Sequence, residues 1–265
     1  MNIVIITGAS SGIGREFAQQ LDKGLYNVDV FWLIARRKER LEELARGLNH
    51  PARIFSLDLQ KESDIHSFQE TLAQEKPVIR MLINCAGYGL MGAFNSIDLN
   101  GQCGQVDLNC RALIQMTHSC LPYMKKKSRI IQLASSAAFL PQADFAVYAA
   151  SKSFVLSFSR ALRQELKDRQ IYVTAVCPGP VRTEFFERAE QFGSTLAVKK
   201  LTMIEASQVV REALAASARN QAVSVPSLPI KAFHLAAKLL PHEIMLQTAS
   251  LLKYLQTITE ERKGI

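Results

Sequence analysis

Short runs of apolar, often β-branched residues alternate along the chain with longer segments whose apolar residues recur at helical spacing. The runs predict strands at Ile3–Thr7, Val28–Ala35, Arg53–Leu57, Val78–Asn84, Arg129–Ala134, Ile171–Cys177 and Ala222–Val225. The segments between them predict helices over 12–23, 38–48, 62–75, 100–124, 147–169 and 206–219. Strands that alternate with helices in this way indicate a doubly wound parallel sheet with helices on both faces, a Rossmann-like α/β fold.

The prolines at 226 and 229 mark the one sharp change in composition. We therefore expect a single domain over 1–226, with a substrate lid at about 184–205, and an amphipathic helical tail over 227–265 that packs on or beside it. Leu240-Pro241 should break this tail into two short helices. Three roles stay open for the tail: contact with a membrane surface, cover over the substrate entrance, or contact with another subunit.

Composition narrows the function without deciding it. The chain has 265 residues, of which 48% are hydrophobic, enough for one large core. Its net charge of +8 is scattered, with Lys125-Lys126-Lys127 as the one basic run, so we expect no nucleic-acid partner. Five cysteines without Cys-x-x-Cys spacing and a start that enters a strand directly favour the cytoplasm. His234 and His242 have no metal-ligand spacing, so no metal site is expected.

A glycine-rich turn directly follows the first predicted strand and opens the first predicted helix. It reads Thr7-Gly8-Ala9-Ser10-Ser11-Gly12-Ile13-Gly14. Glycines here permit a tight turn, close approach of a nucleotide and close packing of helix on strand, and the helix N-terminus attracts a pyrophosphate. An ordinary glycine turn without a ligand is the alternative. We expect Gly8, Ser10, Ser11, Gly12, Ile13 and Gly14 to bind a dinucleotide.

Two arginines, Arg36 and Arg37, follow the second predicted strand. A fold that prefers NAD usually places an acid there for the ribose 2′-hydroxyl, whereas guanidinium groups pair with a 2′-phosphate. These residues therefore favour NADP(H). The alternative is that they begin a charged surface helix, and Arg15 either adds positive charge or is a solvated helix residue.

Two further strand ends carry candidate nucleotide contacts. Asp58 can accept from the adenine amino group and Leu59 can pack on the ring, although aspartate is also common in turns. The small residues of Asn84-Cys85-Ala86-Gly87 permit close approach to the cofactor ribose, and equally suit a tight turn. We include Asn84, Ala86 and Gly87 among the cofactor-binding candidates.

The candidate chemistry lies in the segment that runs from Ser135 to Lys152. Tyr148 and Lys152 are four residues apart, so their side chains share one face of a helix. An adjacent ammonium stabilises a phenolate and should bring the tyrosine pKa towards neutrality. Taken alone, Tyr-x-x-x-Lys is more often a surface pair.

These motifs stand in the order found in the short-chain dehydrogenase/reductase family, which the chain resembles over about residues 2–225. The resemblance implies an NADP(H)-dependent enzyme in which Tyr148 transfers the proton and Ser135 holds the substrate oxygen. It further implies that Lys152 binds the nicotinamide ribose and that Asn109 positions a water beside Lys152. Family spacing favours Ser135 over Ser136, and Asn109 has the alternative role of satisfying helix backbone.

Two more segments bear on the resemblance. Cys85 stands where the family usually has asparagine and cannot replace an amide's paired hydrogen bonds, so some support of the central strand is expected to be lost. The turn after the sixth strand resembles the family's nicotinamide-side turn and adds Pro178, Gly179, Val181 and Thr183 to the cofactor candidates. An apolar pocket or an ordinary core is expected from Phe139, Leu140, Phe145, Phe185 and Phe186.

The expected function is hydride transfer between NADP(H) and a small, apolar carbonyl compound or alcohol, in a homodimer or homotetramer. Two alternatives remain: a non-catalytic NADPH-binding regulator, and a lipid carbonyl reductase held at a membrane surface by its tail.

Overall fold

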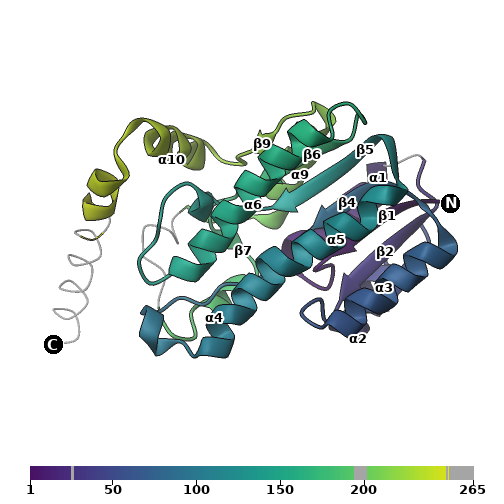
Figure 1. Cartoon of the computed structure of the whole chain (residues 1–265), viewed down its shortest axis with the longest axis horizontal. Coiled ribbons are helices and arrows are strands. Elements are labelled where there is room, and N and C mark those ends of the chain that lie inside the picture. Colours follow the sequence, from purple (N-terminus) through teal and green to yellow (C-terminus); the bar gives the residue numbers. More distant parts are fainter. Residues whose placement is uncertain (25–26, 194–201, 249, 251–265) are drawn as a thin grey trace.

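Seven parallel strands form one twisted sheet in the order β3-β2-β1-β4-β5-β6-β9 (Figure 1). The computed structural model describes residues 1–24, 27–193, 202–248 and 250. The strands are β1 (Asn2–Thr7), β2 (Val30–Ala35), β3 (Ala52–Ser56), β4 (Val78–Asn84), β5 (Met124–Leu133), β6 (Tyr172–Val176) and β9 (Val223–Ser224). The order reverses between β1 and β4, so the carboxyl ends of these two strands flank the crevice where doubly wound folds bind their ligands. The predicted fold class is confirmed.

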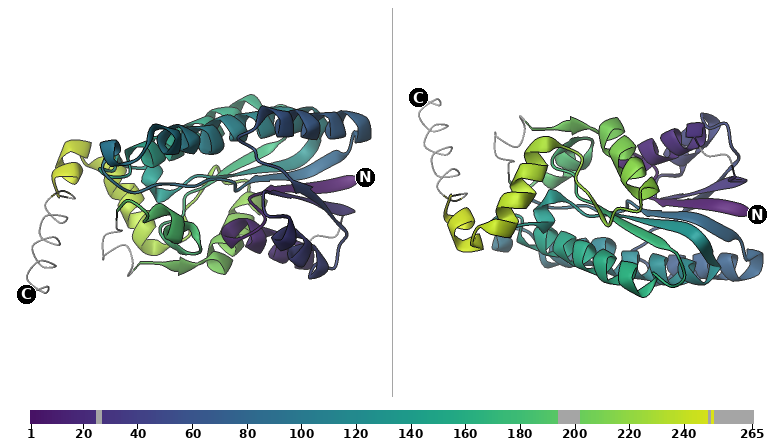
Figure 2. Two further views of the ribbon diagram at one scale, coloured as in Figure 1. Left: turned by 90° about the horizontal axis from the view of Figure 1, so that it is seen from below. Right: turned by 90° about the horizontal axis from the view of Figure 1, so that it is seen from above.

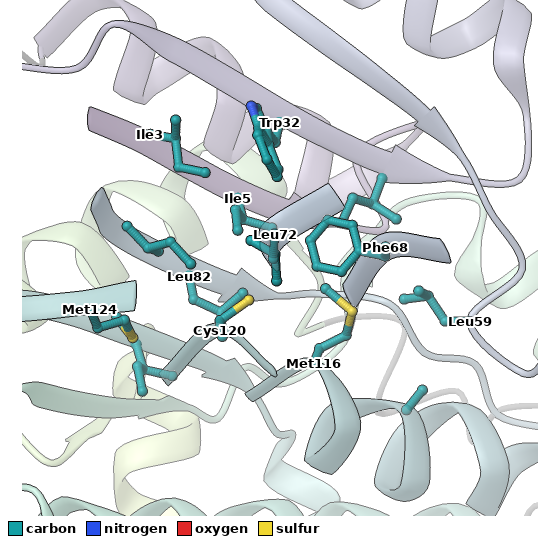
Figure 3. Packing of buried hydrophobic residues seen from close by; sticks show 14 of the residues in the cluster. Ile3, Ile5, Trp32, Leu59, Phe68, Leu72, Leu82, Met116, Cys120 and Met124 are labelled. Carbon is teal, nitrogen blue, oxygen red and sulfur yellow. The ribbon is translucent and has the colours of Figure 1, made fainter. Parts of the chain in front are cut away.

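Helices cover both faces of the sheet (Figure 2). On one face, α3 (Glu62–Glu75), α5 (Ala112–Cys120) and α6 (Ala146–Glu165) share an apolar cluster that includes Trp32 and Phe68 (Figure 3). On the other, a second cluster joins α1 (Gly12–Gly24), α2 (Lys38–Arg46) and α9 (Ala206–Ala218) to the sheet. Because both faces are covered, the central strands contain long apolar runs, as in β1, where Ile3 to Ile6 are fully buried.

The predicted helix over 100–124 is wrong as a single element. It is divided into α4 (Leu99–Val106), a π-helical turn (Asp107–Arg111), α5 and a 3-10 turn (Leu121–Tyr123). Pro122 lies in the last of these, where a proline cannot continue the backbone hydrogen bonding of a helix. The π-helical turn inserts one residue into the helical repeat, a device frequent at functional sites.

Strand β5 begins at Met124, earlier than the predicted Arg129. Met124 pairs with Ile79 and Arg129 pairs with Met81, so the residues between them bulge out of register. Lys127 takes a left-handed φ of 69° in this bulge. Exposed lysines at a bulge interrupt the apolar alternation that identifies a strand, which is why the sequence pattern missed this segment.

Three short elements and the tail complete the carboxyl-terminal part. β7 (Val181–Arg182) and β8 (Ile204–Glu205) form a separate two-stranded sheet that was not predicted, and α7 (Phe185–Ala189) follows β7. In the tail, α10 (Leu228–Leu239) and a second helical stretch over 242–248 flank the predicted break. Figure 1 places α10 at the end of the molecule opposite the N-terminus. Parts of the predicted lid (194–201) and tail (249, 251–265) lie outside the described residues, and the division at 226 stays a prediction.

Candidate active site

A cavity of about 840 Å³ opens at the carboxyl ends of the strands. Its wall combines the β1–α1 turn, the ends of β2 to β5, the start of α6, the segment from Pro178 to α7, and α10. This volume lies in the upper part of the range found for ligand sites. Nearly all predicted cofactor-binding residues line it: Gly8, Ser10, Ser11, Gly12, Ile13, Gly14, Arg36, Arg37, Asp58, Leu59, Ala86, Gly87, Tyr148, Lys152, Pro178, Gly179, Val181 and Thr183.

The glycine turn is packed too closely to admit side chains at two positions. Gly8 has a φ of 68°, and a Cβ there would lie 2.9 Å from the backbone nitrogen of Ala86. A Cβ on Gly14 would lie 2.3 Å from the Gly8 carbonyl oxygen. The Thr7 hydroxyl fastens the turn to the end of β4 by accepting hydrogen bonds from the Cys85 and Ala86 amides, each at 3.1 Å. The start of α1 is thereby held open towards the cavity, as a pyrophosphate site requires.

The two arginines after β2 lie in different surroundings. Arg37 donates from Nη2 to Ser11 Oγ at 2.7 Å and from Nη1 to Glu184 Oε2 at 2.9 Å. Arg36 is exposed at the cavity rim and has no ion pair within the described part of the chain. Arg15 pairs with Glu43 at 2.7 Å and does not line the cavity, which favours the solvated alternative for that residue.

Asn84 differs from its prediction as a cofactor contact. Its side chain is buried under the sheet, where Nδ2 donates to Gln132 Oε1 at 2.9 Å and to Thr117 Oγ1 at 3.1 Å. It therefore ties β4 to β5 and α5 and does not line the cavity. Cys85, the departure from the family pattern, is a lining residue whose thiol pKa burial raises to about 12, so it is an unreactive small residue.

Tyr148 and Lys152 lie one turn apart on α6, and both are buried at the cavity wall. Lys152 Nζ lies 5.6 Å from the centre of the Tyr148 ring and donates to the Leu133 carbonyl at 2.8 Å. The Tyr148 ring stacks on Phe145 with 4.2 Å between centroids. Gly89 makes this possible, because a Cβ there would lie 2.6 Å from the Tyr148 ring.

Burial dominates the protonation of this pair. It raises the pKa of Tyr148 to about 12, against a smaller lowering effect of its hydrogen bond with Ser135. Burial also lowers the pKa of Lys152 to about 8, although the nearby thiols of Cys85, Cys110 and Cys177 act to raise it. The expected lowering of the Tyr148 pKa by Lys152 is not observed in this structure, where the Lys152 ammonium donates to the Leu133 carbonyl and burial raises the Tyr148 pKa.

The remaining two predicted catalytic residues take different places. Ser135 lines the cavity, and its Oγ accepts from the Ala137 amide at 3.1 Å. Asn109 lies behind the wall on the π-helical turn, where it bonds the backbone of Tyr88 in both directions and donates to Ser151 Oγ at 3.0 Å. A Cβ on Gly87 would meet both Asn109 Oδ1 (2.7 Å) and Lys152 Nζ (3.4 Å), so the amide and the ammonium converge behind Gly87.

Aromatic side chains pack with Tyr148 in the cavity wall. Phe145, Phe185 and Phe186 line the cavity as predicted, whereas Phe139 and Leu140 do not. Phe139 instead stacks on His234 of α10, with 4.0 Å between ring centroids. Sequence reasoning also missed several lining residues, namely Tyr88, Met91, Gln142, Glu184, Arg188, Pro229, Ile230 and Phe233.

The last three of these belong to the tail, so α10 forms part of the wall. Gly179 allows this contact, because a Cβ there would lie 2.7 Å from Ile230. The amphipathic pattern of the tail indicated a helix but carried no signal for which surface it covers. Arg188 lies over the Tyr88 ring, with its guanidinium carbon 3.6 Å from the ring centroid, and interacts electrostatically with Arg36 and Asp58.

No helix over 1–24, 27–193, 202–248 and 250 is long and apolar enough to cross a membrane. Within the same ranges, no group of three or more His, Cys, Asp or Glu side chains is arranged to hold a metal ion.

Comparison with known proteins now assigns the family. The short chain dehydrogenase model matches residues 2–193. Sulfoacetaldehyde reductase 2 of Chromohalobacter salexigens is 35% identical over 193 residues (69% of this chain, 74% of the relative). An NADP-dependent 3-hydroxy acid dehydrogenase of Schizosaccharomyces pombe is 36% identical over 190 residues (69% and 72%). A short-chain dehydrogenase from Sphingobium yanoikuyae, solved with NADPH, superposes with a TM-score of 0.77 at 30% identity (90% and 92%).

The fold and the crevice at its switch point are those of a dinucleotide-binding α/β protein. The chain belongs to the short chain dehydrogenase family. The resemblance drawn from the ordered motifs is confirmed.

Proposed function

We propose that the protein reversibly interconverts an apolar ketone or aldehyde and the corresponding alcohol with NADP(H), using Tyr148 as the acid and base. One observation carries this proposal: a single cavity contains the glycine turn at one end and Ser135, Tyr148 and Lys152 at the other. Relatives named for NADP-dependent reactions and a neighbour solved with NADPH support the choice of cofactor.

The residues at the nucleotide end fit this cofactor. Gly8 and Gly14 have no side chain to obstruct the start of α1, and Arg36 and Arg37 supply positive charge beside it. Asp58 and Leu59 line the wall next to them. When bound, NADP(H) supplies or accepts the hydride.

At the catalytic end, the chain's own groups handle the proton. The raised pKa keeps the Tyr148 phenol protonated at neutral pH, so it can donate to a carbonyl oxygen as that oxygen gains negative charge. Ser135 would hold the same oxygen by a hydrogen bond. Lys152, with a pKa of about 8, can replace the proton lost by Tyr148, and Asn109 would position a water beside it. Proton donation by the phenol is the step that reduction of a carbonyl requires.

The wall around Tyr148 favours an apolar substrate. Met91, Phe145 and Phe185 pack with Tyr148 in one apolar cluster, and Ile230 and Phe233 line the same cavity. Arg188 also lines the cavity, with its guanidinium group over the Tyr88 ring.

The test is NADPH oxidation against a panel of aliphatic, aromatic and carboxylated carbonyl compounds, repeated with NADH. Tyr148→Phe should reduce kcat by about 10²- to 10⁴-fold, the usual contribution of a general acid. Its NADPH affinity, measured by calorimetry, should stay within a few fold. The matched control is Tyr172→Phe, which removes a phenol from the start of β6, outside the cavity. Full activity of Tyr148→Phe on an identified substrate would refute the assigned role.

The exposed face of α10 favours a second function, reduction of lipid carbonyls at a membrane surface. Leu228, Leu235 and Leu239 are 78%, 59% and 72% exposed, beside the exposed Lys231 and Lys238. Co-sedimentation with anionic vesicles, compared between the full chain and a chain ending at 226, tests this function.

The predicted homodimer or homotetramer has separate support. Ile114 on α5 and Phe154 on α6 are 41% and 37% exposed, and Phe154 stacks on Phe158 along the outer side of α6. Sedimentation of the intact protein measures this assembly. The cysteines are all free, in keeping with the cytoplasmic location, which stays a prediction.

A further inference from the structure

The nucleotide end of the cavity already contains an anion supplied by the chain. Glu184 Oε2 accepts from Arg37 Nη1 at 2.9 Å, and Glu184 Oε1 accepts from Arg40 Nη1. These two hydrogen bonds lower the pKa of the Glu184 carboxyl, which is therefore ionised at neutral pH. Glu184 lines the cavity just before α7, whereas both arginines follow β2. The contact thus joins the lid segment to the nucleotide end.

Arg37 has few donors left for a second anion. A guanidinium group has five N–H bonds. Arg37 donates from Nε and Nη2 to Ser10 Oγ (3.3 and 3.2 Å), from Nη2 to Ser11 Oγ (2.7 Å) and from Nη1 to Glu184 (2.9 Å). A phosphate that takes a bidentate position on this group must therefore displace one of these acceptors. The neutral hydroxyls can turn and donate to a phosphate, but the carboxylate can only repel it.

We propose that Glu184 sets the preference between NADPH and NADH by competing with the nucleotide 2′-phosphate for Arg37 and Arg40. This inference rests on the proposed use of NADP(H). NADH has no 2′-phosphate and can bind while the Glu184 ion pairs persist. NADPH must break them, so the carboxylate weakens NADPH binding selectively. The preference of the intact protein for NADPH over NADH is then weaker than Arg37 and Arg40 alone would give.

The size of the effect follows from the exposure of the pairs. The Arg37, Arg40 and Glu184 side chains are each between 41% and 43% exposed, so solvent screens their attraction. Breaking two such pairs, together with relief of the repulsion between carboxylate and phosphate, corresponds to about a three- to tenfold change in affinity. The effect should shrink as salt is added.

Glu184→Gln tests this, because it removes the charge and keeps the side-chain size. Its matched control is Glu205→Gln, which breaks an exposed ion pair with Arg182 (2.8 Å) in the neighbouring β7–β8 sheet, outside the cavity. Calorimetry at low salt would give the Kd of NADPH and NADH for each protein. Adenosine 2′,5′-bisphosphate and 5′-AMP serve as smaller probes that differ in the 2′-phosphate alone.

Glu184→Gln should tighten NADPH and the bisphosphate by about three- to tenfold, and change NADH and 5′-AMP by less than about twofold. Glu205→Gln should change none of the four. Equal tightening of NADPH and NADH, no change, or weaker NADPH binding would each overturn the role of Glu184. Failure of the unaltered protein to bind either dinucleotide would instead refute the proposed function itself.

Discussion

Lys152→Met should remove the free-energy cost of burying the Lys152 ammonium in the folded protein. The lysine pKa falls from its ordinary value of 10.5 to about 8 in the folded protein because burial disfavours the ammonium. Between these two values the unfolded chain binds a proton that the folded protein does not, so stability rises with pH across this window. Below pH 8 both states are protonated, and the folded protein bears the full desolvation penalty.

The magnitude follows from the width of that window. Each pH unit is worth about 1.4 kcal/mol, so between pH 7 and pH 9.5 the wild-type protein should gain about 2 kcal/mol relative to Lys152→Met. The variant also loses the hydrogen bond to the Leu133 carbonyl and changes the packing. Those contributions do not depend on pH, so they cancel when the difference between the two proteins is compared at two pH values.

Urea denaturation of both proteins without cofactor at pH 7 and pH 9.5 measures this difference. The control is Lys167→Met, which removes an exposed lysine and should leave the two-pH comparison within about 0.5 kcal/mol. If the stability difference between the wild type and Lys152→Met were the same at both pH values, the desolvated ammonium would not be the origin of the shift. A loss of wild-type stability relative to Lys152→Met between pH 7 and pH 9.5 would contradict the sign of the pKa shift.

Two further predictions concern the ends of the cavity. Gly14→Ala should lower the free energy of unfolding by about 2 kcal/mol, because its Cβ would lie 2.3 Å from the Gly8 carbonyl oxygen. Gly24→Ala on the same helix is the control. Its Cβ would meet nothing within 4 Å, so the free energy of unfolding should change by less than about 1 kcal/mol. Urea denaturation compares the two. Phe233→Ala should raise KM for a bulky ketone about tenfold with little change in kcat, since it removes cavity wall. Leu235→Ala, on the same helix but 59% exposed, should leave KM unchanged, and an equal effect of both variants would point to damage of the whole helix.

The sequence predicted the sheet well because its strands are buried on both faces. β4 was placed at its observed bounds, Val78–Asn84, and α3 at Glu62–Glu75. The failures have local causes: exposed lysines hid the start of β5, and the π-helical turn preserves enough helical periodicity to hide the division of α4 from α5. The two-residue strands β7 and β8 are too short to produce a period.

The site was predictable where neighbouring residues in the sequence indicate a residue's role, as for Gly8 and for Tyr148 with Lys152. It was not predictable where the role depends on a partner distant in sequence. Glu184 contacts Arg37 across 147 positions, and Phe233 reaches the cavity from the tail. Burial has no local signature either, which explains why the direction of the Tyr148 pKa was mistaken.

The contact between Glu184 and the two arginines has a consequence for directed evolution. Loops that cover a substrate are natural targets for exchange, because they are expected to alter selectivity while leaving the nucleotide end intact. Here an exchange that includes position 184 also removes the counter-ion of Arg37 and Arg40. A library of grafted lids would therefore mix changes in substrate selectivity with changes in dinucleotide preference in one screen. Diversifying the arginines with the lid, or assaying every clone with both dinucleotides, would separate the two.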